Sequence, residues 1–133
     1  MIILEHGGTS ENAEHLDICF CPLHGLLDTI SKKWALMIIA VIGNHGSAGF
    51  KELKRQLCNL RSKKMSNTLK DLEEHGLGYR QWEKHTPSGG REYLHVSGWE
   101  LRELLISLLA WVMKNGGHAD ERCPIHFNAK NVS

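Results

Sequence analysis

Residues 50–76 read FKELKRQLCNLRSKKMSNTLKDLEEHG and contain two segments with the apolar spacing of amphipathic helices. The first segment covers 50–57 and the second covers 62–75, where Gly76 ends the pattern. The apolar positions on one face are Phe50, Leu53 and Leu57 in the first segment and Met65, Leu69 and Leu72 in the second. The residues CNL (58–60) between them are too few for anything but a turn. We therefore predict two helices joined by a tight turn, a helix-turn-helix.

Basic side chains are concentrated in this same part of the chain. Residues 50–70 contain seven lysines and arginines and one acidic residue, Glu52, whereas the other 112 residues contain nine basic and fourteen acidic side chains. A strongly positive segment on a slightly acidic body is suited to binding a phosphate backbone. The alternative is that these side chains form only a solvated helix face.

Two helices are predicted before this segment. Residues 17–30 carry leucines at helical spacing, with Pro22 tolerated near the start. Residues 33–42 form a nearly continuous apolar helix that belongs in the core, and the glycines of GNHGSAG (43–49) end it.

A hairpin and a last helix are predicted after Gly76. Residues 79–84 and 91–96 have strand-compatible composition, and HTPSGG (85–90) supplies the turn between them. Ser97 to Glu100 fit a capping box that opens a leucine-rich helix. The resulting fold class is mainly α with a small β-hairpin wing, a winged helix-turn-helix.

The chain is long enough for one domain. Its longest apolar run is too short to span a bilayer, and the first residues lack the basic region of a secretory signal. We therefore expect a cytoplasmic protein without a membrane partner. Neither a phosphate-cradling glycine motif nor a catalytic triad can be placed, so no enzyme is expected.

Three stretches resemble the HxlR-type winged helix-turn-helix transcriptional regulators, relatives of the MarR group. They are CPLHGLLDTISKKW (21–34), FKELKRQLCNL (50–60) and MSNTLKDLEEHGLGYR (65–80). The resemblance implies a homodimer that binds double-stranded operator DNA. The recognition helix, 62–75, would enter the major groove, and the wing, 79–96, would lie on the backbone or in the minor groove.

The resemblance also implies a division of the chain. Residues 1–16 would be an N-terminal extension, 17–116 the winged helix-turn-helix domain with flanking dimerisation helices, and 117–133 a tail that carries Cys-Pro-Ile-His. The family usually carries a small hydroxyl residue where this chain has Arg61, so we expect a different base preference.

The side chains expected to contact DNA are lysines, arginines, a serine and an asparagine, which can reach base edges or phosphates. Side chains near the start of the recognition helix enter the groove deepest, and Arg91 is our choice for the wing. The predicted contacts are Lys51, Lys54, Arg55, Arg61, Lys63, Lys64, Ser66, Asn67, Lys70, Lys84 and Arg91. The alternative function is a winged-helix module for protein interaction or assembly, without operator binding.

The two ends of the chain repeat one pattern, Cys-Pro-x-His. The set Cys21, His24, Cys123 and His126 is the Cys₂His₂ combination that zinc prefers, so zinc is a candidate cofactor. A second reading is a redox switch, in which the helix start lowers the pKa of Cys21 and Cys19 is the resolving thiol. The third reading is inert packing. We expect Cys58 to be a core side chain.

Overall fold

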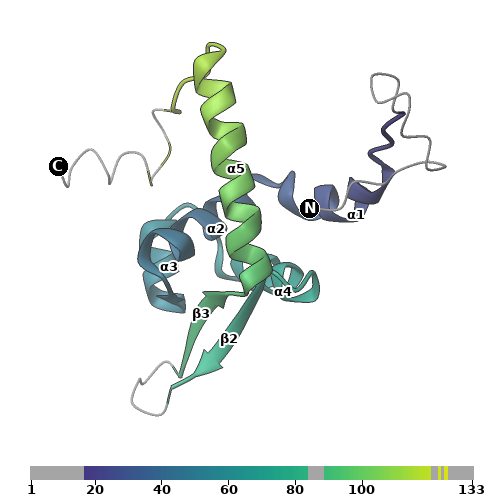
Figure 1. Cartoon of the computed structure of the whole chain (residues 1–133). Helices are drawn as coiled ribbons and strands as arrows, with labels where there is room; N and C mark the ends of the chain where they lie inside the picture. Colours follow the sequence, from purple (N-terminus) through teal and green to yellow (C-terminus); the bar gives the residue numbers. More distant parts are fainter. Residues whose placement is uncertain (1–16, 84–88, 121–122, 124, 126–133) are drawn as a thin grey trace.

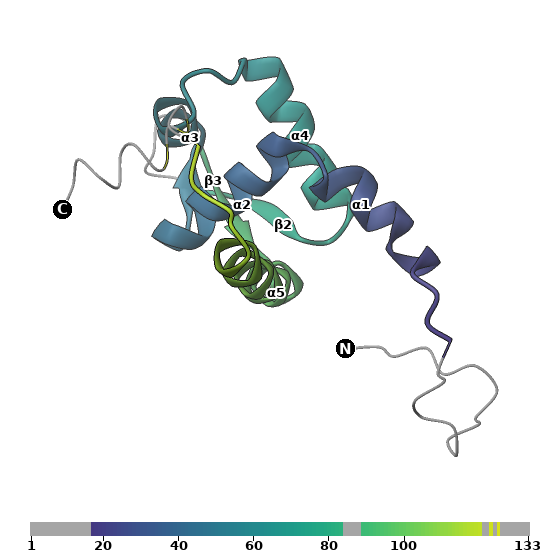
Figure 2. The same cartoon turned by 90° about the horizontal axis from the view of Figure 1, so that it is seen from above.

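The computed structural model describes residues 17–83, 89–120, 123 and 125, and it confirms the winged helix-turn-helix (Figure 1). A short 3₁₀ turn, Cys21–Leu23, precedes the first helix. The elements that follow are α1 (His24–Ile30), α2 (Lys33–His45), β1 (Ala48–Gly49), α3 (Phe50–Gln56), α4 (Ser62–Glu74), β2 (Gly78–Trp82), β3 (Gly90–Leu94) and α5 (Val96–Lys114). Figure 2 shows α2 surrounded by the other helices and by the sheet.

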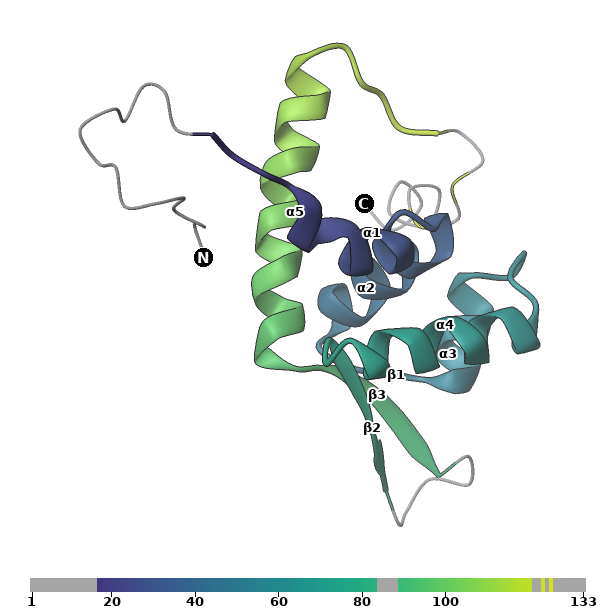
Figure 3. The same ribbon diagram turned by 90° about the vertical axis from the view of Figure 1, so that its right-hand side faces the viewer.

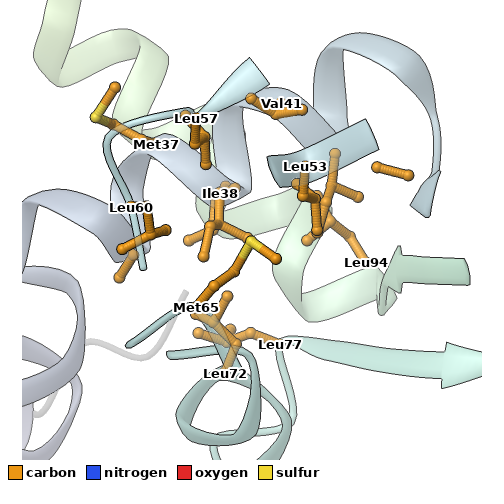
Figure 4. Close-up of a cluster of buried hydrophobic side chains, with 14 residues drawn as sticks. Met37, Ile38, Val41, Leu53, Leu57, Leu60, Met65, Leu72, Leu77 and Leu94 are labelled. Atoms are coloured by element: carbon orange, nitrogen blue, oxygen red, sulfur yellow. The ribbon is translucent and has the colours of Figure 1, made fainter. Parts of the chain in front are cut away.

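The core is built around α2, whose apolar side chains are covered on several sides. The α2 residue Ile38 is fully buried and lies near Leu53 of α3 and Met65 of α4 (Figure 4). Full burial of a leucine or isoleucine side chain contributes roughly 1.5–3 kcal/mol, so this cluster is the main source of stability. The buried apolar residues are Ala35, Met37, Ile38, Ile39, Val41, Ile42, Ala48, Leu53, Leu57, Leu60, Met65, Leu72, Leu77 and Leu94.

The sheet is antiparallel with strand order β1-β3-β2. In the hairpin, Tyr79 pairs with Tyr93 and Arg80 pairs with Glu92. The strand β1 was not predicted, because a two-residue strand has no period of its own and forms only by pairing with β3. Since β1 runs directly into α3, this pairing attaches the wing to the first helix of the helix-turn-helix.

The first helix begins later than predicted. Helix was expected from residue 17, but the chain has no helix before the 3₁₀ turn that contains Pro22. Proline has no backbone N–H to donate and fits only a first helical turn, so the helical segment starts at the proline and does not run through it. At the other end of this helical pair, α2 continues three residues past its predicted end and stops at Gly46, whose φ is 84°.

The predicted capping box at the start of α5 is wrong. The helix begins at Val96, and its N-cap residue, His95, makes no side-chain cap hydrogen bond. Ser97 instead donates through its hydroxyl to the carbonyl oxygen of Gly76, at 2.5 Å. Gly98 lies against the backbone of Leu77, where a Cβ atom would clash. The start of α5 is therefore positioned by tertiary contacts with the turn after α4.

Among the described residues, no helix combines the length and the apolar character that crossing a bilayer requires.

His75, directly after α4, ties the recognition helix to α1. Its Nε2 lies 3.0 Å from the carbonyl oxygen of Gly25, and its Nδ1 lies 3.0 Å from the carbonyl oxygen of Asp71 and 3.2 Å from the hydroxyl of Thr29. Thr29 is only 4% exposed. An ion pair between Lys32, the N-cap residue of α2, and Asp71 of α4, 3.7 Å apart, adds a second link to α4.

Replacing His75 with alanine is predicted to destabilise the fold by about 1–3 kcal/mol, because the buried Thr29 hydroxyl loses a partner together with one interhelical bond. The measurement is the free energy of unfolding in urea. His118→Ala, at an exposed position after α5, is the matched control and should change it little. Equal stabilities of the two variants would contradict the bridging role of His75.

Candidate nucleic-acid interface

Helix α4 buries one face and leaves the opposite face in solvent. Met65, Thr68 and Leu72 are buried against the body of the domain. The opposite face exposes the five side chains predicted there, Lys63, Lys64, Ser66, Asn67 and Lys70. The helix therefore presents donors and acceptors to the outside, as base and phosphate contacts require. Their contact with DNA stays a prediction.

The start of α4 is electrostatically unfavourable for the isolated helix. Its first turn contains Lys63 and Lys64 but no acidic residue, and the N-cap residue, Arg61, makes no side-chain cap bond. The N-terminal end of a helix carries partial positive charge, so each cation there costs about 0.3–1 kcal/mol. The same charges favour an anion placed at this end. Cations at the N-terminal end of a helix, where acidic residues are normally preferred, are typical of a binding site.

The α3 side chains divide into exposed and internally bonded ones. Lys51 and Arg55 are exposed and available for backbone phosphates, as predicted. Lys54 is half-buried, and its Nζ donates to the carbonyl oxygen of Leu60. This bond closes the turn between α3 and α4, and the contact of Lys54 with a phosphate stays a prediction.

Arg91 of the wing also has an internal role. Its Nε donates to the Ser47 hydroxyl at 3.0 Å, and its guanidinium pairs with Glu52 of α3 at 3.5 Å. The side chain is thereby held between the sheet and the start of α3, and not extended toward a phosphate or a minor groove. The other predicted wing contact, Lys84, lies outside the described residues.

The wing carries two exposed side chains that the sequence analysis missed, Arg80 and Trp82 of β2. Arg80 Nε donates to Glu92 Oε2 at 2.6 Å, and Glu92 is 6% exposed. Trp82 is 68% exposed, and its ring centroid lies 5.4 Å from the Arg80 guanidinium carbon. The sequence signal was the strand period of two, which places positions 80 and 82 of GYRQW (78–82) on the same face of the strand.

A shallow depression joins α4 to the wing. Its volume is about 210 Å³, and its lining residues are Ser66, Leu69, Lys70 and Glu73 of α4 with Arg80 and Glu92 of the sheet. The lining contains two cations and two carboxylates. The recognition helix and the wing therefore share one continuous surface that has little net charge at its centre.

Cys19 and Cys21 form a pair of neighbouring thiols whose order of ionisation is the reverse of the predicted one. The backbone N–H of Cys21 donates to Sγ of Cys19 at 3.4 Å, and this bond holds the pKa of Cys19 below its usual value. The side-chain hydrogen bond to Cys19 raises the pKa of Cys21. The prediction that the helix start lowers the pKa of Cys21 is therefore wrong, since its thiol shares a hydrogen with the neighbouring sulfur. Cys19 is the more readily ionised thiol.

The other two cysteines are placed differently from each other. Cys58 is exposed in the turn between α3 and α4, so its prediction as a core residue is wrong. Cys123 packs with Ile125 against the hydrophobic core. His126 lies outside the described residues. Within the described part of the chain, no three His, Cys, Asp or Glu side chains come together as metal ligands would. The zinc set stays a prediction.

A large apolar surface is exposed on α5, and we call it the α5 patch. Its side chains are between 38% and 62% exposed. They are Leu104, Leu108, Leu109, Trp111, Val112 and Met113. The N-terminal segment and α1 add Ile18, Phe20, Leu23 and Leu27. Figures 1 and 3 show the C-terminal half of α5 projecting beyond the helical body. Apolar surface of this kind marks an interaction site.

Comparison with known proteins gives a consistent result. The model of a family described as HxlR-like helix-turn-helix matches residues 29–120. An HTH-type transcriptional regulator of Halalkalibacterium halodurans, BH0655, is 30% identical over 115 residues, which cover 86% of this chain and 97% of the relative.

Two solved structures share the fold. The reduced form of the transcriptional regulator YodB from B. subtilis has a TM-score of 0.67 at 24% identity and covers 78% of this chain and 100% of its own. The redox regulator HypR in its oxidized form has a TM-score of 0.63 at 22% identity, covering 74% of this chain and 100% of its own.

The thiol geometry predicts that Cys19 reacts with iodoacetamide before Cys21, because alkylation requires the thiolate. Its lowered pKa also predicts that its labelling persists to lower pH than the labelling of Cys21. Partial labelling across a pH series, followed by peptide fragmentation between the two cysteines at Phe20, measures both. Cys58 has no other cysteine near it in the sequence, so its labelling rate is the internal reference for a thiol without a neighbouring thiol. Earlier labelling of Cys21 would contradict the geometry.

Proposed function

The chain belongs to the HxlR-like helix-turn-helix family of transcriptional regulators, and we propose that it acts as a homodimer which binds operator DNA. The observation that carries this proposal is the exposed stripe of α4, with two lysines at a helix start that has no acidic counterpart. In the proposed complex α4 enters the major groove. Lys51 and Arg55 of α3 contact the flanking phosphates.

The α5 patch supports the dimer. An isolated chain would leave six large apolar side chains of one helix in water, which is unfavourable by about 25 cal/mol per Å² of apolar area. A second copy offers the same patch, and a twofold axis covers both patches at once. To read two half-sites on one side of the duplex, the two α4 helices of the proposed dimer would lie about one DNA turn apart, and the preferred site would be an inverted repeat.

We further propose that the Cys19 and Cys21 pair adjusts DNA affinity, since it adjoins the apolar N-terminal segment. A peroxide would oxidise the Cys19 thiolate to a sulfenic acid and release hydroxide. The Cys21 thiol would then attack that sulfur, forming the disulfide and releasing water. HypR, which shares the fold, is described as a redox regulator.

Zinc remains a separate proposal for the terminal residues. Cys21 and His24 are exposed around the start of α1, whereas Cys123 packs against the core. Within the described residues of one chain these groups do not form a ligand cluster.

A protein-interaction module is the second candidate function, and the α5 patch alone would suit it. It does not account for the exposed lysines of α4, which apolar association does not need. The two functions differ in salt dependence, because only binding to phosphates releases counterions.

Changing Lys63 and Lys64 together to alanine is predicted to weaken binding to duplex DNA at least several-fold. The slope of log K against log salt should fall by about 1.8, because two phosphate contacts are lost. Fluorescence anisotropy titrations at several salt concentrations measure both quantities. Lys33→Ala with Lys114→Ala removes the same charge away from α4 and should have little effect. Equal losses in the two double variants would contradict a specific DNA face.

Replacing Leu108 and Leu109 with glutamate is predicted to convert the dimer to a monomer. These side chains are 56% and 57% exposed in the single chain, and two copies would bury them against each other. Sedimentation equilibrium should give the mass of one 15.0 kDa chain for the variant and of two for the parent. Glu103→Ala, an exposed change on the same helix, should remain dimeric. A monomeric parent protein would contradict the proposed dimer.

A further inference from the structure

Trp82 is a large apolar side chain left in solvent at the end of β2. It is 68% exposed, whereas Leu94, a hydrophobic residue of the same sheet, is buried in the core. A single exposed apolar residue is common on protein surfaces and is not by itself a site. Trp82 differs from such a residue because neighbouring groups hold its ring in place and because it continues the surface of α4.

The Trp82 ring is supported by neighbouring groups. Beside it lies the guanidinium of Arg80, 5.4 Å from the ring centroid, and Arg80 is fixed in turn by its 2.6 Å bond to the buried Glu92. The ring also lies against Gly89, where a Cβ atom would clash with it and where φ is 83°. A side chain held in one orientation loses little conformational entropy on binding, so the wing presents a preorganised aromatic surface.

The ring stands on the face of the sheet that continues the surface of α4. Side chains two apart in a strand share a face, so Trp82 lies on the same side as Arg80. Arg80 lines the depression that also contains Ser66 and Lys70 of the recognition helix. Figures 1 and 3 show the hairpin projecting away from the helical body. Trp82 therefore extends the α4 surface outward along the wing.

The ring is uncharged, and its immediate neighbours are a paired arginine and carboxylate. Because this group of side chains has no net charge, it would attract a DNA phosphate only weakly. The apolar edges of deoxyribose and the walls of a minor groove match a flat ring with one N–H donor, because they offer carbon surface and hydrogen-bond acceptors.

We propose that Trp82 is the main contact of the wing with duplex DNA, and that its ring packs against the sugar edges of the minor groove beside the site read by α4. This inference rests on the proposed function. It assigns the wing contact to an aromatic residue, whereas Arg91 stays bonded to Ser47 and Glu52.

The experiment titrates labelled duplex DNA with the full chain and its variants at several salt concentrations. Trp82→Ala should weaken binding about 5- to 50-fold, in the range found when aromatic contacts to nucleic acids are removed. The slope of log K against log salt should not change, because no cation is lost. Trp82→Phe keeps a ring and should recover much of the affinity.

Gln81→Ala is the matched control. Gln81 is the neighbouring exposed residue of β2, and the alternation of the strand places it on the opposite face. Its removal should leave DNA affinity unchanged. Thermal unfolding of each variant shows whether the fold is retained, which is expected because both side chains are exposed.

The possible outcomes separate the two claims. If Trp82→Ala binds as the parent does while Lys63→Ala with Lys64→Ala binds weakly, the role of Trp82 is overturned and operator binding stands. If Trp82→Ala lowers the salt slope by about 0.9, as the loss of one phosphate contact would, the ring acts by holding Arg80 and the proposed direct contact is overturned. If the parent does not bind duplex DNA, both proposals fail.

Discussion

The burial of α2 is the constraint on which the rest of the structure depends. Its apolar side chains contact α1, α3, α4, α5 and the sheet, so one helix sets the positions of all the others. A helix that is covered on so many sides cannot rotate or slide without exposing isoleucines such as Ile38 and Ile42. The two helices of the helix-turn-helix therefore keep a fixed angle to each other and to the wing, as recognition of a rigid duplex requires.

Several charged side chains form bonds within the domain, whereas others are exposed on its surface. Lys54 closes the turn between α3 and α4, Arg91 joins the wing to α3, and Arg80 pairs with the buried Glu92. The exposed cations that remain are concentrated at the start of α4 and on α3. The local helix is less stable for carrying lysines at its N-terminal end, and the buried face of α4 offsets that cost. Stability and the proposed DNA contact thus use opposite faces of the same helix.

The sequence predicted the helix-turn-helix because its signal is local. The apolar positions Leu53 and Leu57, and then Met65 and Leu72, repeat at the helical period and are buried in the structure. The strand-compatible composition on both sides of HTPSGG (85–90) predicted the wing, and the family resemblance supplied the expectation of a dimer. The short strand β1 escaped prediction because it exists only through its partner β3. The internal bonds of Lys54 and Arg91 were not predicted for the same reason. Their partners are brought close only by folding, and the sequence around a basic surface residue does not indicate such a partner.

The most direct test of the account is selection of binding sites from random duplex DNA by the full, reduced chain. One inverted repeat should be enriched, with half-sites about one helical turn apart, because two α4 helices related by a twofold axis would read the major groove on one side of the duplex. Lack of enrichment after repeated rounds, in a preparation that is folded and dimeric, would contradict it. The exposed face of α4 would then have to serve a partner other than DNA.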